Sequence, residues 1–358
     1  MHCHPFKRRA RSPVSMRRQG GAALVVALLV FALCTAVIVA MKLEFTRFYQ
    51  RSANVFLGEQ SQAYLRGAED LARLALLADY DQDDNRDTPR DDLTEIWAQT
   101  AAPYPLDEGG WLAGGLEDLQ GRFNLNSLRD SASGEGEPRF TPAQAQFIRL
   151  LQALGEPPLS EAEAIQVTRA IGDWLDQDSV PAPDGAEDDY YYGLTPAYRS
   201  ANGPMASVSE IRAVANVSPE LYRALRPWVS VWPQKPAPLN IHTAPAMVLR
   251  SINADDDLSP LSEADGQTLL DQRETTGFAD LDDFLASPVF SGKQEQLVQV
   301  KTLLGESSSY FLLDASVEVA DRNMRLYSVL ERGRRQVTAI ARSSVIDQVQ
   351  DSPKLDTP

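Results

Sequence analysis

The chain has 358 residues, 43% of them hydrophobic, which is enough to bury a substantial core and to form more than one folded unit. Its formal net charge of −16 at pH 7 repels phosphate backbones, so the composition argues against nucleic-acid binding. Beyond Cys34 there is no cysteine and a single histidine, His242, which excludes a disulfide scaffold, a cysteine-based zinc site and thiol catalysis from that region.

The N-terminal segment has the composition of a membrane anchor. Residues 1–21 hold six basic residues and no acidic one, and the run Ala22–Met41 carries no charge. Such a run can cross a bilayer as a helix, and the positive charges before it favour a cytoplasmic N-terminus. A plain signal anchor is an alternative. A cleaved secretory signal has a shorter apolar core, and a lipoprotein signal at Cys34 is disfavoured because Leu33 stands where a small residue is needed.

The junction between the basic and apolar segments matches the leader of type IV pilin-like proteins. Gly20 and Gly21 follow the basic stretch, and the apolar run begins at Ala22. Pilin-like proteins are cut after such a glycine on the cytoplasmic side, and they keep the apolar helix as the packing core of a filament. We therefore expect processing between Gly21 and Ala22, with cleavage after Gly20 as the alternative.

One long helix is predicted after the glycine pair. No proline occurs between Pro13 and Pro89, and apolar residues recur mostly at helical spacing over Lys42–Leu77. A helix from about Ala22 to Ala78 would be roughly 85 Å long at about 1.5 Å per residue. The acidic run Asp79–Asp87 is expected to end the helix and to form a solvated loop.

The remaining chain shows strand signals at both ends and helical signals between them. Residues 116–126 alternate as a strand or a bent hairpin would, and helices are expected between 141 and about 304. Thr141–Pro142 and the pair Ser160 and Glu163 are typical of helix starts. Three alternating segments near the C-terminus predict an antiparallel meander, over Tyr310–Val319, Met324–Glu331 and Gln336–Ser344.

These elements predict an α+β fold in which a long N-terminal helix packs on an antiparallel sheet and a large all-helical domain is inserted between the early and late strands. The expected division is a leader, a membrane-spanning part of the helix, the first part of the α/β domain, the inserted helical domain, the C-terminal strands and a disordered tail, at 1–21, 22–41, 42–130, 131–306, 307–346 and 347–358.

The densest group of carboxylates lies between Asp173 and Asp189, in a stretch broken by two prolines. Calcium takes about six to eight oxygen ligands and tolerates irregular geometry. The stretch is not an EF-hand, because Pro181 stands where that loop requires glycine. Flanking aromatic residues favour a packed loop whose carboxylates need a counter-charge, the alternative being a solvated acidic loop. We expect a calcium site with ligands drawn from Asp173, Asp176, Asp178, Glu187 and Asp188.

Residues 239–284 resemble a helix-hairpin-helix module, which often binds the DNA backbone through a glycine-rich hairpin. Here Asp255–Asp257 place three carboxylates where a phosphate would lie, so we expect a scaffold and no nucleic-acid binding. We expect His242 to have a capping or core role. Because the chain has no Walker loop, dinucleotide fingerprint or nucleophile elbow, we expect no enzymatic activity.

In their order and spacing, several stretches resemble the general secretion pathway protein K family, whose members are the largest minor pseudopilins of type II secretion. They are Gly21–Val30, Gly67–Asp70, Asp118–Asn126, Asp173–Asp178, Gly185–Tyr191, Tyr198–Asn202 and Leu239–Ala244. The resemblance extends from about Gly21 to Arg342. It implies a pilin-like helix and sheet with a helical insertion, bound calcium, and a position at the pseudopilus tip with two other minor pseudopilins, I and J.

The resemblance also implies a single-pass protein of the bacterial inner membrane with a periplasmic C-terminal domain. Its expected partners are the I, J and H components, prepilin peptidase and the inner-membrane secretion platform, and its mature N-terminus would be methylated. Ordinary pilins carry glutamate at the fifth mature position, where this chain has Val26, and the K component typically lacks that glutamate. Two alternatives remain: an anchored, calcium-stabilised acidic hydrolase, and a DNA-uptake receptor that uses the helix-hairpin-helix module.

Overall fold

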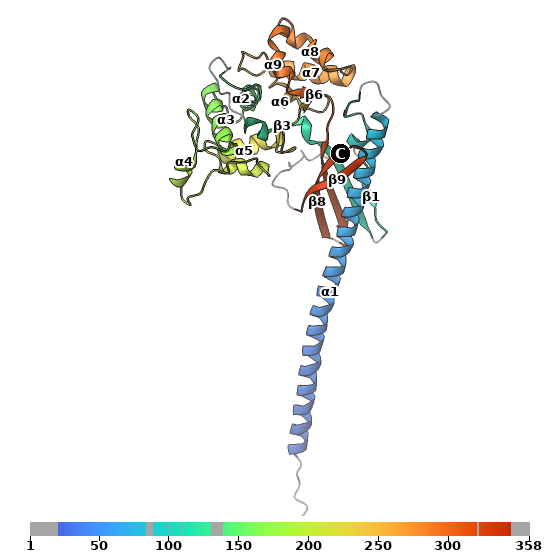
Figure 1. The fold of residues 1–358 in the computed structure, drawn as a ribbon. Coiled ribbons are helices and arrows are strands. Elements are labelled where there is room, and N and C mark those ends of the chain that lie inside the picture. The colour runs from blue at the N-terminus through green and yellow to red at the C-terminus, as the bar shows by residue number, and fades with distance from the viewer. Residues whose placement is uncertain are drawn as a thin grey trace, which may run out of the picture. The chain divides into compact units, whose positions relative to one another are not determined.

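The structure is a computed structural model that describes residues 21–83, 89–99, 101–107, 109–129, 139–320 and 322–344 (Figure 1). The chain divides into two compact units, residues 1–60 and 61–358. Gly20 and nearly all of the predicted leader, the segment 131–138 and the predicted tail 347–358 lie outside the described residues.

Helix α1, Ala22–Asp83, begins in the first unit and ends in the second. In the first unit its apolar side chains are exposed, as at Leu24, Phe31 and Ile38. It is the one helix of the described chain that is long and apolar enough to cross a membrane. The predicted end near Ala78 is wrong, because the helix continues to Asp83.

The second unit contains a five-stranded antiparallel sheet with the order β1-β2-β7-β8-β9. The predicted C-terminal meander is confirmed as its last three strands. Leu116 pairs with Leu313, and Leu313 with Ser328, so β7 lies between β2 and β8. The strand bounds are Tyr104–Pro105, Gly110–Asp118, Tyr310–Val319, Arg322–Gly333 and Gln336–Ser343.

Residues 61–83 of α1 pack on this sheet. The buried carboxylate of Glu69 accepts hydrogen bonds from Ser328 Oγ on β8 and from Arg342 Nε on β9, both at 2.7 Å. Leu65 and Leu76 are buried on the same helix. The hydrogen bond from Arg342 keeps the pKa of Glu69 below its ordinary value despite burial.

The segment 116–126, predicted as a strand or a bent hairpin, contains parts of two strands with a 3₁₀ turn between them. Strand β2 ends at Asp118, a 3₁₀ turn follows at Leu119–Gly121, and β3 (Phe123–Asn124) pairs in parallel with β4 (Val229–Ser230). A Cβ on Gly121 would lie 2.7 Å from Thr243 Oγ1, so the chain turns where only glycine fits against the helical region.

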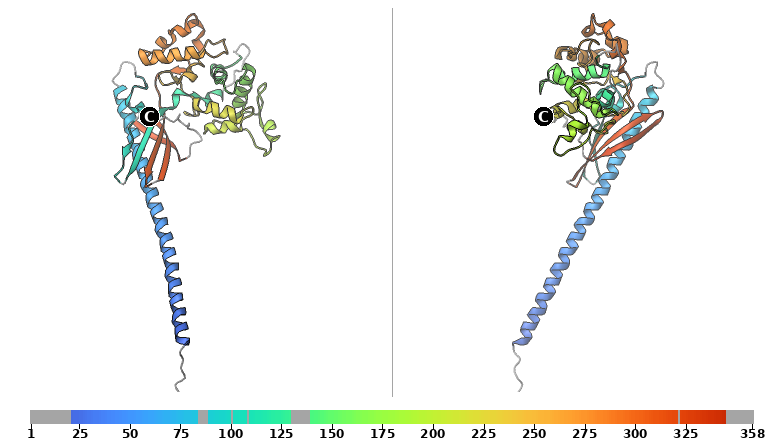
Figure 2. Two further views of the ribbon diagram at one scale, coloured as in Figure 1. Left: turned by 180° about the vertical axis from the view of Figure 1, so that it is seen from behind. Right: turned by 60° about the vertical axis from the view of Figure 1, so that its left-hand side comes forward.

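Between β2 and β7 the chain is mainly helical, and Figure 2 shows these helices from two further sides. The predicted capping boxes are confirmed: Thr141 pairs with Gln144, and Ser160 with Glu163. The α-helices are α2 Pro142–Ala153, α3 Glu161–Leu175, α4 Asp188–Tyr192, α5 Pro219–Leu225, α6 Ala246–Leu249, α7 Glu263–Thr275, α8 Leu281–Leu285 and α9 Val298–Lys301. Further 3₁₀ turns occupy Ile96–Ala98, Leu125–Arg129, Val208–Ala213, Arg226–Trp228, Pro288–Phe290 and Gln294–Gln296.

Two hydrophobic clusters fill the helical region. One contains Phe147, Ile171 and Tyr191, and the other contains Leu249, Leu269 and Phe284. The residues of the second cluster come from the stretch of chain that runs from β5 (Leu239–Asn240) to β6 (Leu304–Gly305). These two strands pair in parallel. Helical periodicity therefore predicts the class of this region, whereas the pairing of its distant short strands depends on tertiary packing.

The hairpin of the helix-hairpin-helix-like segment is engaged within the protein. The fully buried Arg149 donates to the carbonyl oxygens of Ala254 and Asp257, at 2.7 and 2.6 Å. Asp255 accepts from the backbone N–H groups of Gln299 and Val300 at the start of α9. These contacts fix the hairpin in place; the scaffold role expected for it stays a prediction.

Candidate functional site: a carboxylate cluster and a buried polar network

Three of the five carboxylates predicted as metal ligands converge. Asp176 caps the C-terminus of α3, Glu187 caps the N-terminus of α4, and Asp178 lies on the loop between them. One carboxylate oxygen from each lies within 4.8 Å of the others. Two helix ends and one loop thus place three oxygen ligands around a common point.

Several oxygens at this cluster lack a partner. Asp176 Oδ1, Glu187 Oε1 and Asn202 Oδ1 are buried and accept no hydrogen bond from any residue that the structure describes. Asn202 is held beside the cluster because its Nδ2 donates to the carbonyl oxygen of Asp178 at 3.0 Å. Buried acceptors without partners are costly, and a hard cation would satisfy them.

The electrostatics of the cluster favour a cation. Burial raises the pKa of Asp176, and the neighbouring Asp178 raises it further. Burial likewise raises the pKa of Glu187, with a further contribution from Asp176. Because the carboxylates repel one another, a divalent ion would stabilise their charged forms.

The other two predicted ligands, Asp173 and Asp188, lie outside this group of three and contact the backbone. The buried Asp173 accepts from the Ala182 N–H at 3.2 Å, and a Cβ on Gly185 would lie 2.0 Å from its Oδ2. Burial raises the pKa of Asp173 to about 6. Asp188 accepts from the Ser200 N–H at 3.1 Å. Both therefore hold the loops that carry the cluster.

The aromatic residues beside the cluster differ in burial. Tyr191 is fully buried and packs edge-on against Trp174, with ring centroids 5.3 Å apart, and it stacks on Tyr198 at the same distance. Tyr190, one of the flanking aromatic residues that were expected to be packed, is 48% exposed. The cluster thus has an apolar floor and an open side.

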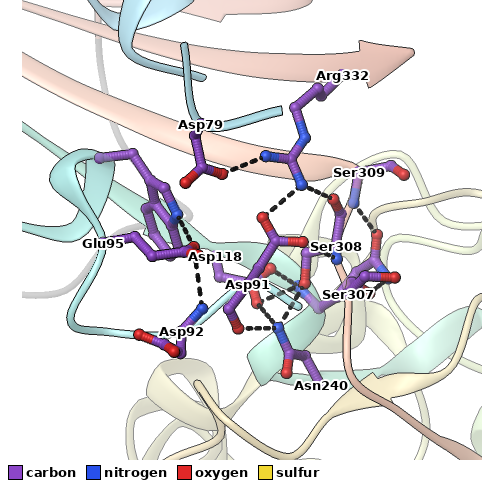
Figure 3. A network of polar contacts seen from close by, with 12 residues as sticks. Asp79, Asp91, Asp92, Glu95, Asp118, Asn240, Ser307, Ser308, Ser309 and Arg332 are labelled. Carbon is purple, nitrogen blue, oxygen red and sulfur yellow. Dashed lines mark hydrogen bonds and ion pairs between the residues drawn. The ribbon is translucent and has the colours of Figure 1, made fainter. Parts of the chain in front are cut away.

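A second carboxylate group lies where α1 meets the sheet (Figure 3). Oxygens of Asp79, Asp91 and Glu95, all buried, lie within 4.8 Å of one another. Arg332 on β8 donates to Asp79 Oδ2 at 2.7 Å and also to Asp91. The prediction that Asp79 belongs to a solvated loop is therefore wrong; residues 84–87 of that run lie outside the described residues.

The same network reaches the helical region. Asp118 at the end of β2 accepts from Ser308 Oγ at 2.6 Å and from Thr243 Oγ1 at 2.5 Å. Asn240 donates to the carbonyl oxygen of Asp91 at 2.9 Å and to Asp118 Oδ2 at 3.1 Å (Figure 3). This group joins α1, the sheet and the β5 segment.

Burial dominates the electrostatics of this network. Burial, together with smaller contributions from Glu95 and Asp91, raises the pKa of Asp79 to about 7 against the opposing effect of Arg332. Burial raises the pKa of Asp118 to about 6. Several carboxylates share a single guanidinium, so the network titrates close to neutral pH.

The predicted processing site lies at the start of the described chain. Gly21 is in a turn and Ala22 is the first residue of α1. Cleavage between them stays a prediction.

Comparison with known proteins gives a consistent result. Two models described as type II secretion system (T2SS), protein K match residues 121–234 and 239–305. The type II secretion system protein K of Aeromonas hydrophila is 35% identical over 332 residues, covering 89% of this chain and 95% of that protein. The protein of the same name from Pseudomonas aeruginosa is also 35% identical, with 89% and 91% covered.

A solved structure agrees with the sequence relatives. A chain in the crystal structure of the GspK-GspI-GspJ complex from the enterotoxigenic Escherichia coli type 2 secretion system is 26% identical and superposes with a TM-score of 0.70. The match covers 83% of this chain and 99% of that one. The fold is α+β and pilin-like, and the chain belongs to the type II secretion system protein K family.

Proposed function

We propose that this protein is the K-type minor pseudopilin of a type II secretion system, that it caps the tip of the periplasmic pseudopilus with other minor pseudopilins, and that it helps to initiate pseudopilus assembly for protein export across the outer membrane. The observation that carries the proposal is the match, over nearly the whole of a solved chain, to a member of a GspK-GspI-GspJ complex. By analogy, components I and J are direct partners, and component H follows them in the filament.

A tip position is supported by the residue at mature position five. With cleavage after Gly21 this residue is Val26, which cannot neutralise the terminal amine of a neighbouring subunit. An unpaired charge in a bilayer costs on the order of several kcal/mol, so a subunit without the carboxylate is best placed where no neighbour requires it. The helical region between β2 and β7 would also clash in a repeating lattice.

Docking through α1 is supported by exposed apolar side chains in the second unit. Leu71 is 65% exposed and Leu74 is 61% exposed. Beside them lies an apolar groove whose lining includes Leu71, Ile96 and Tyr104. The apolar helix of a neighbouring pseudopilin would cover this surface.

The anchor supports an inner-membrane location. Its positive leader favours a cytoplasmic N-terminus, which places residues 42–358 in the periplasm and the Gly21–Ala22 bond within reach of prepilin peptidase. In this arrangement the membrane-spanning helix contacts the secretion platform before extraction into the filament. The role is one of assembly, without substrate turnover. The comparisons lend no support to the hydrolase or to the DNA-uptake receptor.

Calcium is the proposed ion at the cluster of Asp176, Asp178 and Glu187. The unpartnered oxygens of Asp176, Glu187 and Asn202 supply hard ligands, and the exposed side of the loop leaves room for water. The ion would hold the α3–α4 loop and so stabilise the periplasmic head.

The experiment that tests the function mixes the head of this protein, beginning near Glu44, with the heads of the matching I and J components. Light scattering after gel filtration gives the stoichiometry. A 1:1:1 complex is the expected result. Homopolymers, or immunogold labelling along the filament shaft, would overturn the tip assignment.

A further inference from the structure

A pocket of about 470 Å³ lies between the segment that follows α1 and the end of α7. Its chemically distinctive lining residues are Arg90, Asp92, Leu93, His242, Arg273, Glu274 and Phe278. It is separate from the carboxylate cluster and adjoins the network around Arg332, because the Asp92 N–H donates to Glu95 Oε2 at 3.1 Å (Figure 3). Although the chain as a whole is acidic, two guanidinium groups and an imidazole gather here.

One of the two guanidinium groups in the pocket has no ion-pair partner among the described residues. Asp92 pairs with Arg90, because its Oδ2 accepts from Arg90 Nε at 3.1 Å, and its Oδ1 accepts from the Thr94 N–H at 2.8 Å. Arg273 donates to the carbonyl oxygen of Ala244 at 2.6 Å, and within the described chain it forms no ion pair. Glu274 also lines the pocket, but its side chain is exposed and it does not pair with Arg273 among the described residues. The half-buried guanidinium of Arg273 is therefore available to an anion.

His242 adds a second unsatisfied group. The residue is 3% exposed, lines the pocket, and has a buried Nε2 without a hydrogen-bond partner. Burial and the nearby Arg90 and Arg273 lower its pKa to about 4, against the opposing effect of Asp92, so the imidazole is neutral and can donate one hydrogen bond.

We propose that this pocket binds a carboxylate on a short apolar stem, the chemistry presented by the C-terminal residue of a peptide. The planar fork of a guanidinium matches a carboxylate. A single guanidinium without an ion-pair partner in the described chain, with carboxylates nearby, suits a monoanion better than a doubly charged phosphate. Leu93 and Phe278 supply apolar wall for the stem.

The chain supplies its own probe for this binding. His242 is the one histidine outside residues 1–20, since the others are His2 and His4. The full-length protein in detergent, with His2→Gln and His4→Gln, therefore has a single imidazole signal in nuclear magnetic resonance. N-acetyl-leucine is titrated against this signal, with N-acetyl-leucinamide, acetate and inorganic phosphate as comparisons.

N-acetyl-leucine is expected to shift the His242 signals in a saturable way and to raise the imidazole pKa, because an anion then offsets Arg90 and Arg273. The amide should bind about tenfold more weakly or worse, since it lacks the charged acceptor. Acetate is expected to bind more weakly than N-acetyl-leucine because it lacks the apolar stem, and acetate binding as tightly would overturn the assignment of a peptide C-terminal residue.

Substitutions distinguish binding in this pocket from a general effect of the protein's charge on the ligand. Arg273→Gln should reduce affinity about tenfold or more, whereas Arg223→Gln, which removes an exposed charge elsewhere, should leave it unchanged. Glu274→Gln removes the repelling carboxylate and should tighten binding, a gain that misfolding cannot produce. No shift at millimolar N-acetyl-leucine, equal binding of acid and amide, or tighter binding of phosphate would overturn the proposal.

Discussion

Arg332 on β8 donates a 2.7 Å hydrogen bond to Asp79 in the last turns of α1, across 253 positions of sequence. Its guanidinium also donates to Asp91 and to the carbonyl oxygen of Ser308, and lies 4.9 Å from the centroid of the Phe311 ring. One cation therefore connects the helix, the segment that follows it and the sheet.

Removing this cation should be strongly destabilising. Arg332→Met leaves Asp79 and Asp91 buried without a counter-charge, which is expected to lower the free energy of unfolding by about 3–5 kcal/mol. Thermal unfolding of the head measures the loss. The control is Arg325→Met, whose ion pair with Asp314 is 3.4 Å long and whose side chain is 55% exposed. Equal effects of the two substitutions would contradict the role given to Arg332.

The stability of the protein should depend on pH because folding changes the pKa of Asp79. Its pKa rises from 3.8 to about 7 on folding, so between these values the folded state holds a proton that the unfolded state has released. This contribution to stability is complete below the unfolded pKa and is lost as the pH rises through the folded pKa. Asp79→Asn should therefore flatten the decline in stability between about pH 4 and about pH 7.

Denaturant unfolding across that pH range gives the measurement. Asp70→Asn, at a carboxylate whose side chain is 70% exposed, should leave the slope unchanged. The prediction is wrong if the Asp79 variant keeps the slope of the parent protein.

Calcium should stabilise the head. At a concentration about 100-fold above its dissociation constant, an ion that binds only the folded state adds about 2.7 kcal/mol, so a chelator should lower the melting temperature. Asp176→Asn and Glu187→Gln should abolish this response, whereas Asp189→Asn, on the neighbouring exposed residue, should keep it. A melting temperature of residues 45–346 that ignores the chelator would refute the site.

The apolar surface of α1 should be needed for assembly. Leu71→Asp together with Leu74→Asp places charges where a neighbouring helix would dock, and should weaken the complex with the I and J heads at least tenfold. Val298→Asp is a matched control, because Val298 is 62% exposed but belongs to the helical region. Calorimetric titration compares the three proteins; equal affinities would place the interface elsewhere.

Processing should leave Ala22 as the mature N-terminus. Intact mass measurement of membrane-extracted protein should show loss of residues 1–21, or of residues 1–20 if Gly20 is the site. A terminus at residues 36–41, inside the apolar run, would indicate an ordinary secretory signal instead.

The parts of the fold that local chemistry determines could be predicted. The period-two alternation over Tyr310–Val319 gave a strand with those bounds, and Ser160 with Glu163 marked the start of α3. Helix α1 continued past its predicted end because Asp79 reads as a turn former locally but is buried against Arg332. No local pattern links residues so far apart in the chain.

The candidate site was partly predictable for the same reason. The density of carboxylates between Asp173 and Asp189 located it, but which of them converge depends on the geometry of two helix ends. Asn202 was not predicted as a candidate metal ligand, although it lies in the stretch Tyr198–Asn202 on which the family resemblance partly rests. The density of carboxylates in the sequence identified the loop, whereas the fold determines which of their oxygen atoms converge.

Asp173 contacts the loop that approaches it at Gly185. This contact should affect the rate and the selectivity with which the proposed site binds an ion. The Asp173 carboxylate ties this loop through the Ala182 N–H, and this tie does not involve the three-carboxylate cluster. The proposed ligand frame would therefore be preorganised, so that a binding ion would have little chain to order. A rigid frame of fixed width should discriminate between calcium and the smaller magnesium by size better than a flexible loop would.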